Sequence, residues 1–155
     1  MKRIGMTKKI LGGREKVKVA VVQAAPVFMD KKRTIEKACR LIKEAGRNGA
    51  ELIAFSEAFI PTYPAYYTVG YETNPHEWTD YMIALQDNSV VIPSEDTEVL
   101  GQAAKEAGAY VVMGCNELDN RRGSCTVYNT LLFIGRDGNV IGKHRKLMPT
   151  YTERI

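Results

Sequence analysis

The chain has 155 residues, of which 45% are hydrophobic and 26% are charged, and its formal net charge is +4. These values are typical of a single globular domain and exclude a disordered chain. No segment approaches the ~18 consecutive apolar residues of a membrane span, and the first residues lack the apolar stretch of a secretory signal. The cysteines Cys39, Cys115 and Cys125 show no metal-ligand spacing, and their odd number favours a reducing environment. We therefore predict a cytoplasmic protein with no membrane partner.

Much of the positive charge lies at the amino terminus, where Met1–Lys18 contains several lysines and arginines but a single acid, Glu15. A basic arm can bind nucleic acid or anionic membranes. No aromatic residue interleaves with these charges, as a surface for single-stranded nucleic acid requires. We therefore expect residues 1–15 to form a flexible, solvated arm without a nucleic-acid partner, and residues 16–155 to form the folded domain.

The first predicted elements form a βαβ unit. Lys16–Ala24 begins with alternation and becomes a β-branched run, which predicts a strand buried on both faces at its far end. Asp30 is suited to cap a helix that Asn48-Gly49 ends, and Leu52–Phe55 is the next strand. The predicted apolar stripe of this helix contains Ile35, Ala38, Cys39, Ile42 and Ala45. The two strands should therefore be parallel, with a right-handed crossover.

The middle of the chain is rich in aromatic residues. Phe59–Thr73 is predicted to be a loop, and His76–Asp87 a weaker helix whose buried side holds Trp78, Met82 and Leu85. Three roles stay open for these aromatic residues: a substrate pocket, an oligomer surface, or ordinary loop packing. The residues concerned are Tyr63, Tyr66, Tyr67, Tyr71, Trp78 and Tyr81.

A second amphipathic helix should begin at Pro93-Ser94, with Ser94 as its cap, and end at Gly108. Its predicted buried stripe contains Val99, Leu100, Ala103, Ala104 and Ala107.

The remaining pattern is that of strands. Strands are predicted at Tyr110–Met113, Val127–Ile134 and Asn139–Lys143, with a surface turn at Asp119–Ser124 and a hairpin at Asp137-Gly138. The layout is therefore α/β, with parallel strands and a late hairpin. Ligands of parallel sheets bind beyond the carboxyl ends of the strands.

Two charged residues lie at such strand ends. Glu57 follows the apolar run that ends at Phe55, and Lys146 follows the last predicted strand. A carboxylate after a buried strand should lie in a low dielectric, which raises its pKa and suits it to act as a general base. A neighbouring lysine would supply positive charge where an oxyanion develops.

Five segments of the chain, taken in order and at their spacing, resemble one protein family. The segments are Val17–Pro26 (VKVAVVQAAP), Ala50–Pro64 (AELIAFSEAFIPTYP), Gly114–Glu117 (GCNE), Tyr128–Thr130 (YNT) and His144–Glu153 (HRKLMPTYTE). Together they resemble the nitrilase (carbon–nitrogen hydrolase) superfamily over residues 16–155. Thr150 and Glu153 favour the nitrilase branch over the amidases.

The resemblance implies an αββα sandwich with a mixed sheet and flanking helices, and a Glu–Lys–Cys catalytic set. Glu57 would be the base, Lys146 the cation that stabilises the intermediate, and Glu153 the second glutamate that positions the set. A small nitrile or amide would be the substrate, hydrolysed through a cysteine thioimidate and thioester. The resemblance implies no metal or organic cofactor, and it implies a homo-oligomer.

The nucleophile that this set requires has no match in the sequence. The cysteine of the family follows the last matching segment, and none of the present cysteines lies in its motif. We therefore expect an amino-terminal portion of a nitrilase that is inactive alone. Such a chain should fold with a complementary carboxy-terminal half or as a multimer.

Two other readings stay open from the sequence. The chain can belong to an amidase or N-carbamoyl hydrolase of the same superfamily, or it can be a non-catalytic assembly fragment that binds nitrilase subunits. A nucleotide-binding α/β domain is disfavoured, because the sequence has no phosphate loop and no dinucleotide-binding glycine fingerprint.

Overall fold

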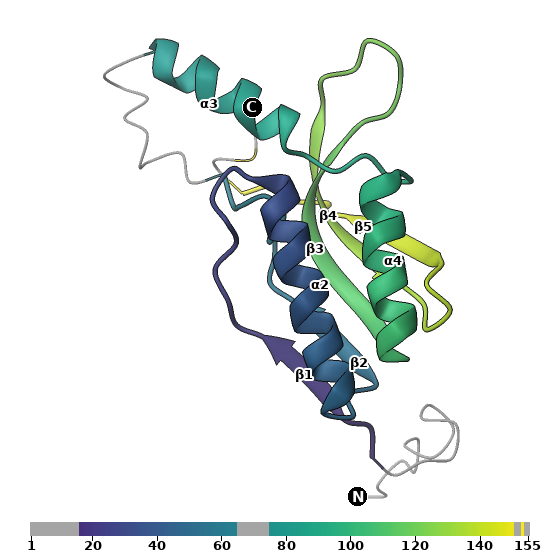
Figure 1. Cartoon of the computed structure of the whole chain (residues 1–155). Coiled ribbons are helices and arrows are strands. Elements are labelled where there is room, and N and C mark those ends of the chain that lie inside the picture. Colours follow the sequence, from purple (N-terminus) through teal and green to yellow (C-terminus); the bar gives the residue numbers. More distant parts are fainter. Residues whose placement is uncertain (1–15, 65–74, 151–152, 154–155) are drawn as a thin grey trace, which may run out of the picture.

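The structure, a computed structural model, describes residues 16–64 and 75–150 together with Glu153. The predicted arm at residues 1–15 and much of the predicted tyrosine-rich loop lie outside the described residues. The fold is α/β, with one mixed sheet and helices against it (Figure 1). The strands are β1 (Val19–Val22), β2 (Leu52–Phe55), β3 (Tyr110–Leu118), β4 (Val127–Ile134) and β5 (Val140–Arg145); the helices are α2 (Lys31–Arg47), α3 (Pro75–Asp87) and α4 (Glu95–Ala107). None of the helices in this part of the chain is long and apolar enough to cross a membrane.

The strands lie in the sheet in chain order, from β1 to β5. β1, β2 and β3 are parallel neighbours, and β4 and β5 follow as antiparallel neighbours. The parallel pairing of β1 and β2 around α2 confirms the predicted βαβ unit. β2 is short and ends opposite the middle of β3, where Ala54 pairs with Val112. The chain after β2 therefore runs beside the second half of β3.

Both helix ends predicted for α2 are confirmed. The Asp30 carboxylate accepts a hydrogen bond from the Arg33 backbone N–H at 2.9 Å, as an N-cap residue does. Asn48 is the C-cap residue, and Gly49 follows with φ of 79°, a left-handed conformation that favours glycine. The predicted stripe holds three of the buried residues of the helix: Ile35, Ala38 and Ile42.

α4 also begins and ends as predicted. Ser94 is the N-cap residue, and its backbone N–H donates a hydrogen bond to the Thr97 hydroxyl at 2.9 Å. Gly108 ends the helix in the left-handed conformation, with φ of 63°. Gly101 of α4 lies directly against the β4–β5 turn, because a Cβ there would meet the Gly138 carbonyl oxygen at 2.2 Å.

The core lies between the helices and one face of the sheet. α2 and α4 lie side by side across this face (Figure 1). In β2, Ile53 and Phe55 are buried in this core, while Leu52 and Ala54 alternate toward the other face. The helices and the sheet thus form one α layer and one β layer.

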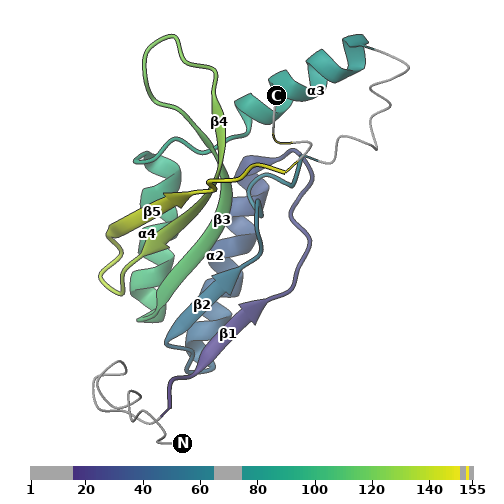
Figure 2. The ribbon, with the colours of Figure 1, turned by 180° about the vertical axis from the view of Figure 1, so that it is seen from behind.

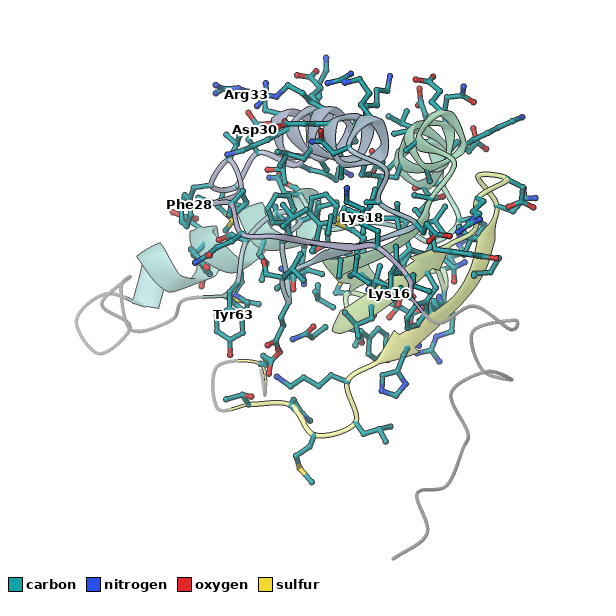
Figure 3. All side chains as sticks on the ribbon, turned by 90° about the horizontal axis from the view of Figure 1, so that it is seen from below. Lys16, Lys18, Phe28, Asp30, Arg33 and Tyr63 are labelled. Carbon is teal, nitrogen blue, oxygen red and sulfur yellow. The ribbon has the colours of Figure 1, made fainter. Side chains whose placement is uncertain are left out.

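The opposite face of the sheet has no helix of the described chain over it (Figure 2). Val19 and Val21 on this face are 49% and 79% exposed, whereas Ala20 and Val22 pack against the core. A view from below places Asp30 and Arg33 on the helix side of the sheet and Tyr63 on the other side (Figure 3). The prediction that β1 is buried on both faces is wrong for the described chain, because β-branched residues favour any strand and not only a covered one.

α3 lies beyond the end of the sheet rather than across its face (Figures 1 and 2). Leu85 of the predicted buried side is buried, Met82 is partly buried, and Trp78 lies outside the residues whose side chains are described. The Gln86 side-chain amide donates to the Cys125 carbonyl oxygen at 2.9 Å, which joins α3 to the loop between β3 and β4.

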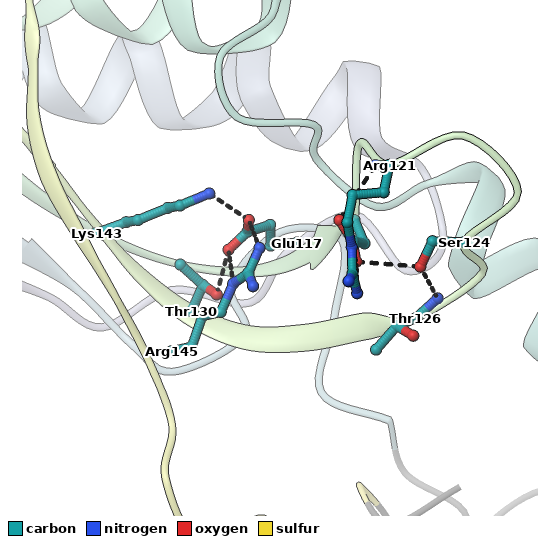
Figure 4. Close-up of polar contacts among 8 residues, drawn as sticks. Glu117, Arg121, Ser124, Thr126, Thr130, Lys143 and Arg145 are labelled. Atoms are coloured by element: carbon teal, nitrogen blue, oxygen red, sulfur yellow. Dashed lines mark hydrogen bonds and ion pairs between the residues drawn. The ribbon is translucent and has the colours of Figure 1, made fainter.

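The sequence predicted that this strand ends at Met113, but β3 continues for five more residues, to Leu118. The added segment holds Glu117, which is only 1% exposed and binds charged residues of β5 (Figure 4). Its carboxylate accepts hydrogen bonds from Lys143 Nζ at 2.5 Å, Arg145 Nη2 at 2.7 Å and Thr130 Oγ1 at 2.8 Å. Burial alone would raise the pKa of Glu117, but these bonds outweigh it and hold the pKa below its usual value.

Replacing Glu117 with glutamine should lower the free energy of unfolding by about 1.5–3 kcal/mol, since hydrogen bonds to a charged group are lost inside the protein. The folded-state pKa is lowered, so the contribution of Glu117 is present above its unfolded-state pKa and is lost as the pH falls through the folded-state pKa. The difference between Glu117→Gln and wild type in urea unfolding should therefore shrink in acid.

Glu106→Gln is the matched control for this prediction. Glu106 pairs with Lys43 at 2.7 Å, but the two side chains are 44% and 42% exposed, and exposed pairs contribute little. An unchanged urea midpoint in both variants would show that the buried carboxylate does not stabilise the packing of β3, β4 and β5.

Candidate active site

Glu57 lies in the turn that leaves β2, where the sequence predicted a functional carboxylate. The next residue, Ala58, has φ of 46°, a left-handed conformation that is uncommon for a residue with a Cβ. Beyond the turn, Ile60 forms a parallel bridge with Cys115 of β3. The turn is therefore held between the end of β2 and the middle of β3.

Lys146 directly follows β5, and its backbone N–H donates to the Asn129 carbonyl oxygen of β4 at 2.8 Å. Its ammonium donates to Glu57 Oε1 at 2.7 Å, to Glu153 Oε2 at 2.8 Å and to Thr150 Oγ1 at 3.0 Å. The three residues that the sequence selected, Glu57, Lys146 and Glu153, thus converge at one place.

Asn129 joins the same cluster and was not selected as a site residue. Its side-chain amide donates to Glu57 Oε1 at 2.6 Å and also to Glu153 Oε1. Tyr128–Thr130 is one of the segments that resemble the superfamily, so the signal was present, but no role had been assigned to its asparagine. Asn129 and Lys146 are the two donors that the carboxylates share.

Glu153 is the more enclosed of the two carboxylates, with its side chain 6% exposed. Burial would raise its pKa, but hydrogen bonds from Lys146, Asn129 and the Thr150 backbone N–H outweigh burial and lower it. The hydrogen bonds to Glu153 and then to Glu57 raise the pKa of Lys146 far above its usual value. The site therefore holds a fixed ammonium between two carboxylates.

The Glu57 side chain is 51% exposed in the described chain, so the prediction of a buried carboxylate is wrong here. The physical reason is its position: Glu57 contacts Asn129 and Lys146 on the far face of the sheet, which no described helix covers. Its two hydrogen-bond donors, Lys146 and Asn129, fix one of its oxygens.

A cavity of about 730 Å³ opens beside the cluster. Asn129, Lys146 and Glu153 line one part of it, and α3 and the start of β4 supply a mainly apolar wall. This wall includes Met82, Leu85, Val127 and Tyr128. Because the polar cluster and the apolar wall share one cavity, a small molecule with a polar reacting group and a hydrocarbon part would fit its chemistry.

The loop between β3 and β4 is fixed by Asp119, which accepts hydrogen bonds from Arg121 Nε at 2.7 Å and Ser124 Oγ at 3.1 Å (Figure 4). The bonds from Arg121 lower the pKa of Asp119 to about 2. The same loop carries Cys125, which is exposed and lines the cavity.

The other two cysteines do not face the cluster. Cys115 is fully buried within β3, and burial raises the pKa of its thiol to about 12. Cys39 lies on α2, where burial also raises the pKa of the thiol. Both thiols are therefore poor sources of a thiolate at neutral pH.

Known proteins with similar sequences cover most of this chain. Nitrilase 2 of an unknown prokaryotic organism is 42% identical over 93% of this chain and 45% of the relative. Nitrilase of Bacillus sp. (strain OxB-1) is 43% identical over 90% of this chain and 39% of the relative. The chain thus spans less than half the length of these relatives.

The fold also matches a solved structure. Nit3 of Saccharomyces cerevisiae, a member of branch 10 of the nitrilase superfamily, aligns with a TM-score of 0.66 at 23% identity, over 89% of this chain and 46% of Nit3. The sequence profile of the family described as Carbon-nitrogen hydrolase matches residues 18–155. The chain therefore belongs to the carbon–nitrogen hydrolase family.

Proposed function

We propose that this chain is the base- and cation-bearing amino-terminal part of a nitrilase, which converts a nitrile to a carboxylic acid and ammonia. The observation that carries the proposal is the contact of Lys146 with both Glu57 and Glu153, at 2.7 and 2.8 Å. The nitrilase names of relatives that are 42% and 43% identical support this branch of the family.

In the proposed reaction, the Glu57 carboxylate takes the proton of a cysteine thiol that the rest of the hydrolase supplies. The thiolate sulfur bonds to the nitrile carbon, and the nitrogen takes up the proton, which gives a thioimidate. A water then loses a proton to Glu57 and adds to the same carbon, and the protons held by Glu57 and by the added hydroxyl group pass to the nitrogen. The resulting tetrahedral intermediate releases ammonia and becomes a thioester, which a second water cleaves to the acid and the free thiol.

Lys146 supplies the positive charge in this scheme. Its raised pKa keeps it protonated at neutral pH, so it can stabilise negative charge on the tetrahedral intermediate. Glu153 and Asn129 position it, because Glu153 binds the ammonium and Asn129 binds both carboxylates. No step of this chemistry uses a metal or an organic cofactor.

The partner of this chain is proposed to be a complementary carboxy-terminal half, which covers the far face of the sheet and brings the cysteine to Glu57. Homo-oligomers of the assembled hydrolase are proposed as its working form. The exposed Val19 and Val21 support the proposal that a partner covers this face, since burying their side chains lowers the free energy.

An ammonia assay tests the proposal. We expect no ammonia from nitriles with this chain alone, because Glu57 and Lys146 cannot replace a covalent nucleophile. We expect release from a chimaeric hydrolase that joins this chain to the part of Nitrilase 2 beyond the matched segment, and Glu57→Gln should abolish it. Amides assayed in parallel distinguish a nitrilase from an amidase of the same family.

A folded chimaeric hydrolase that hydrolyses neither nitriles nor amides would overturn the proposal. Ammonia release by the chain alone would show that it holds its own nucleophile. Cys125→Ser is the control for that outcome, since Cys125 is exposed and lines the cavity beside Lys146.

A further inference from the structure

The turn that carries Glu57 lies against the backbone of β3 at Gly114. A Cβ built on Gly114 would meet the Ser56 carbonyl oxygen at 2.1 Å, Glu57 Cα at 2.8 Å and the Ala58 nitrogen at 2.9 Å. The three nearest atoms thus all belong to the backbone of the turn, which cannot rotate away as a flexible side chain does. A residue with any side chain at position 114 is incompatible with the turn as it stands.

Further contacts lock this turn to the same stretch of β3. The Ile60 N–H donates to the Gly114 carbonyl oxygen at 3.2 Å, and the Asn116 N–H donates to the Ile60 carbonyl oxygen at 2.8 Å. The buried Asn116 side chain also donates to the Thr62 carbonyl oxygen at 2.8 Å. These bonds clamp the chain after Glu57 onto β3, so the turn cannot easily move away from Gly114.

The turn itself is strained at Ala58, whose φ is 46°. A residue with a Cβ adopts this conformation only when its surroundings determine it. The close contact with Gly114 and the clamp onto β3 supply those surroundings. The result is a carboxylate held 2.7 Å from Lys146 Nζ and 2.6 Å from Asn129 Nδ2.

We propose that Gly114 is a positioning residue for Glu57: its missing side chain lets the Glu57–Ala58 turn lie directly on β3, which sets the carboxylate against Lys146 and Asn129. This inference rests on the proposed function for its kinetic consequence. Gly114 does not touch the reacting atoms; it acts through the backbone of the turn.

The test compares kcat and KM of the chimaeric hydrolase with Gly114→Ala, each expressed per folded protein. The added methyl group must push the turn away by about 1 Å, and such a displacement can lower kcat about 10²-fold. KM should change less than about 2-fold, because the displaced group moves protons and does not form the cavity wall. Glu57 does not line the cavity, whereas Lys146 does.

Gly101→Ala is the matched control. Its Cβ would meet the Gly138 carbonyl oxygen at 2.2 Å, a clash of the same kind that lies between α4 and the β4–β5 turn. It should destabilise the protein and leave kcat per folded protein unchanged. Equal kcat values in Gly114→Ala and Gly101→Ala would overturn the proposal.

Glu57→Asp keeps the proposal testable where Gly114→Ala does not fold, because Glu57 is half exposed and tolerates a shorter side chain. It withdraws the carboxylate by one methylene group, and kcat should again fall about 10²-fold. A wild-type kcat in Glu57→Asp would overturn the proposal, since placement on this scale would then not matter. Activity retained in Glu57→Gln would instead contradict the proposed function itself.

Discussion

Replacing Lys146 with alanine is expected to lower kcat of the chimaeric hydrolase by about 10²–10³-fold, the usual loss when one group that stabilises an oxyanion is removed. Lys146 is the ammonium that contacts both Glu57 and Glu153. Its removal also leaves the two carboxylates with the Asn129 amide as their only shared donor among the described residues.

The loss of kcat in Lys146→Ala should not depend on pH in the neutral and mildly alkaline range. The pKa of Lys146 is raised by its hydrogen bonds to Glu153 and Glu57, so its charge persists through neutral and mildly alkaline pH. The ratio of wild-type to Lys146→Ala kcat should therefore be constant over that range. A ratio that falls with rising pH would indicate that Lys146 loses its proton there, contrary to the structure.

Lys143→Ala is the control for Lys146→Ala. Lys143 lies on β5, three residues before Lys146, but its ammonium binds the buried Glu117 on the helix side of the sheet. It should lower stability and leave kcat per folded protein near the wild-type value. Wild-type turnover in Lys146→Ala would remove Lys146 from the mechanism.

The ends of the helices could be predicted because short-range chemistry determines them. Asp30 caps α2 through the N–H of a residue three positions away, and Gly108 supplies the left-handed conformation that ends α4. The end of β3 could not be predicted this way. Glu117 is a strand residue only because Lys143 and Arg145, 26 and 28 residues later, neutralise it inside the protein.

The same distinction applies to the site. Glu57 and Lys146 were identified from their positions after strands and from the family resemblance, and the structure places them in contact although they are 89 residues apart. The segment Tyr128–Thr130 carries part of the family resemblance, but the role of Asn129 could not be predicted, because its partner Glu57 is 72 residues away. The close contact between Gly114 and the Glu57–Ala58 turn could not be predicted for a related reason. The only trace that such a contact leaves in the sequence is a glycine, and a glycine alone does not identify the backbone that lies against it.

We expect this chain alone to associate in solution through the far face of its sheet. The exposed residues of β1 alternate with its core residues, and Val21 is 79% exposed. Tyr110 of β3 lies on the same face and is 44% exposed. Contiguous apolar surface of this kind promotes association, so sedimentation should show species larger than the 17.3 kDa monomer.

A pair of variants separates this face from other apolar surface. Val21→Lys should shift the chain toward the monomer, because a lysine at this position is compatible with the β-strand but its charge opposes burial of the sheet face. Val99→Lys on α4 should not, although Val99 is 45% exposed as well, because it lies on the helix layer. In the chimaeric hydrolase Val21→Lys should cost about 1.5–3 kcal/mol, the free energy of burying one valine. A wild-type chain that is a monodisperse, cooperatively melting monomer would contradict this account, since its sheet face would then need no cover.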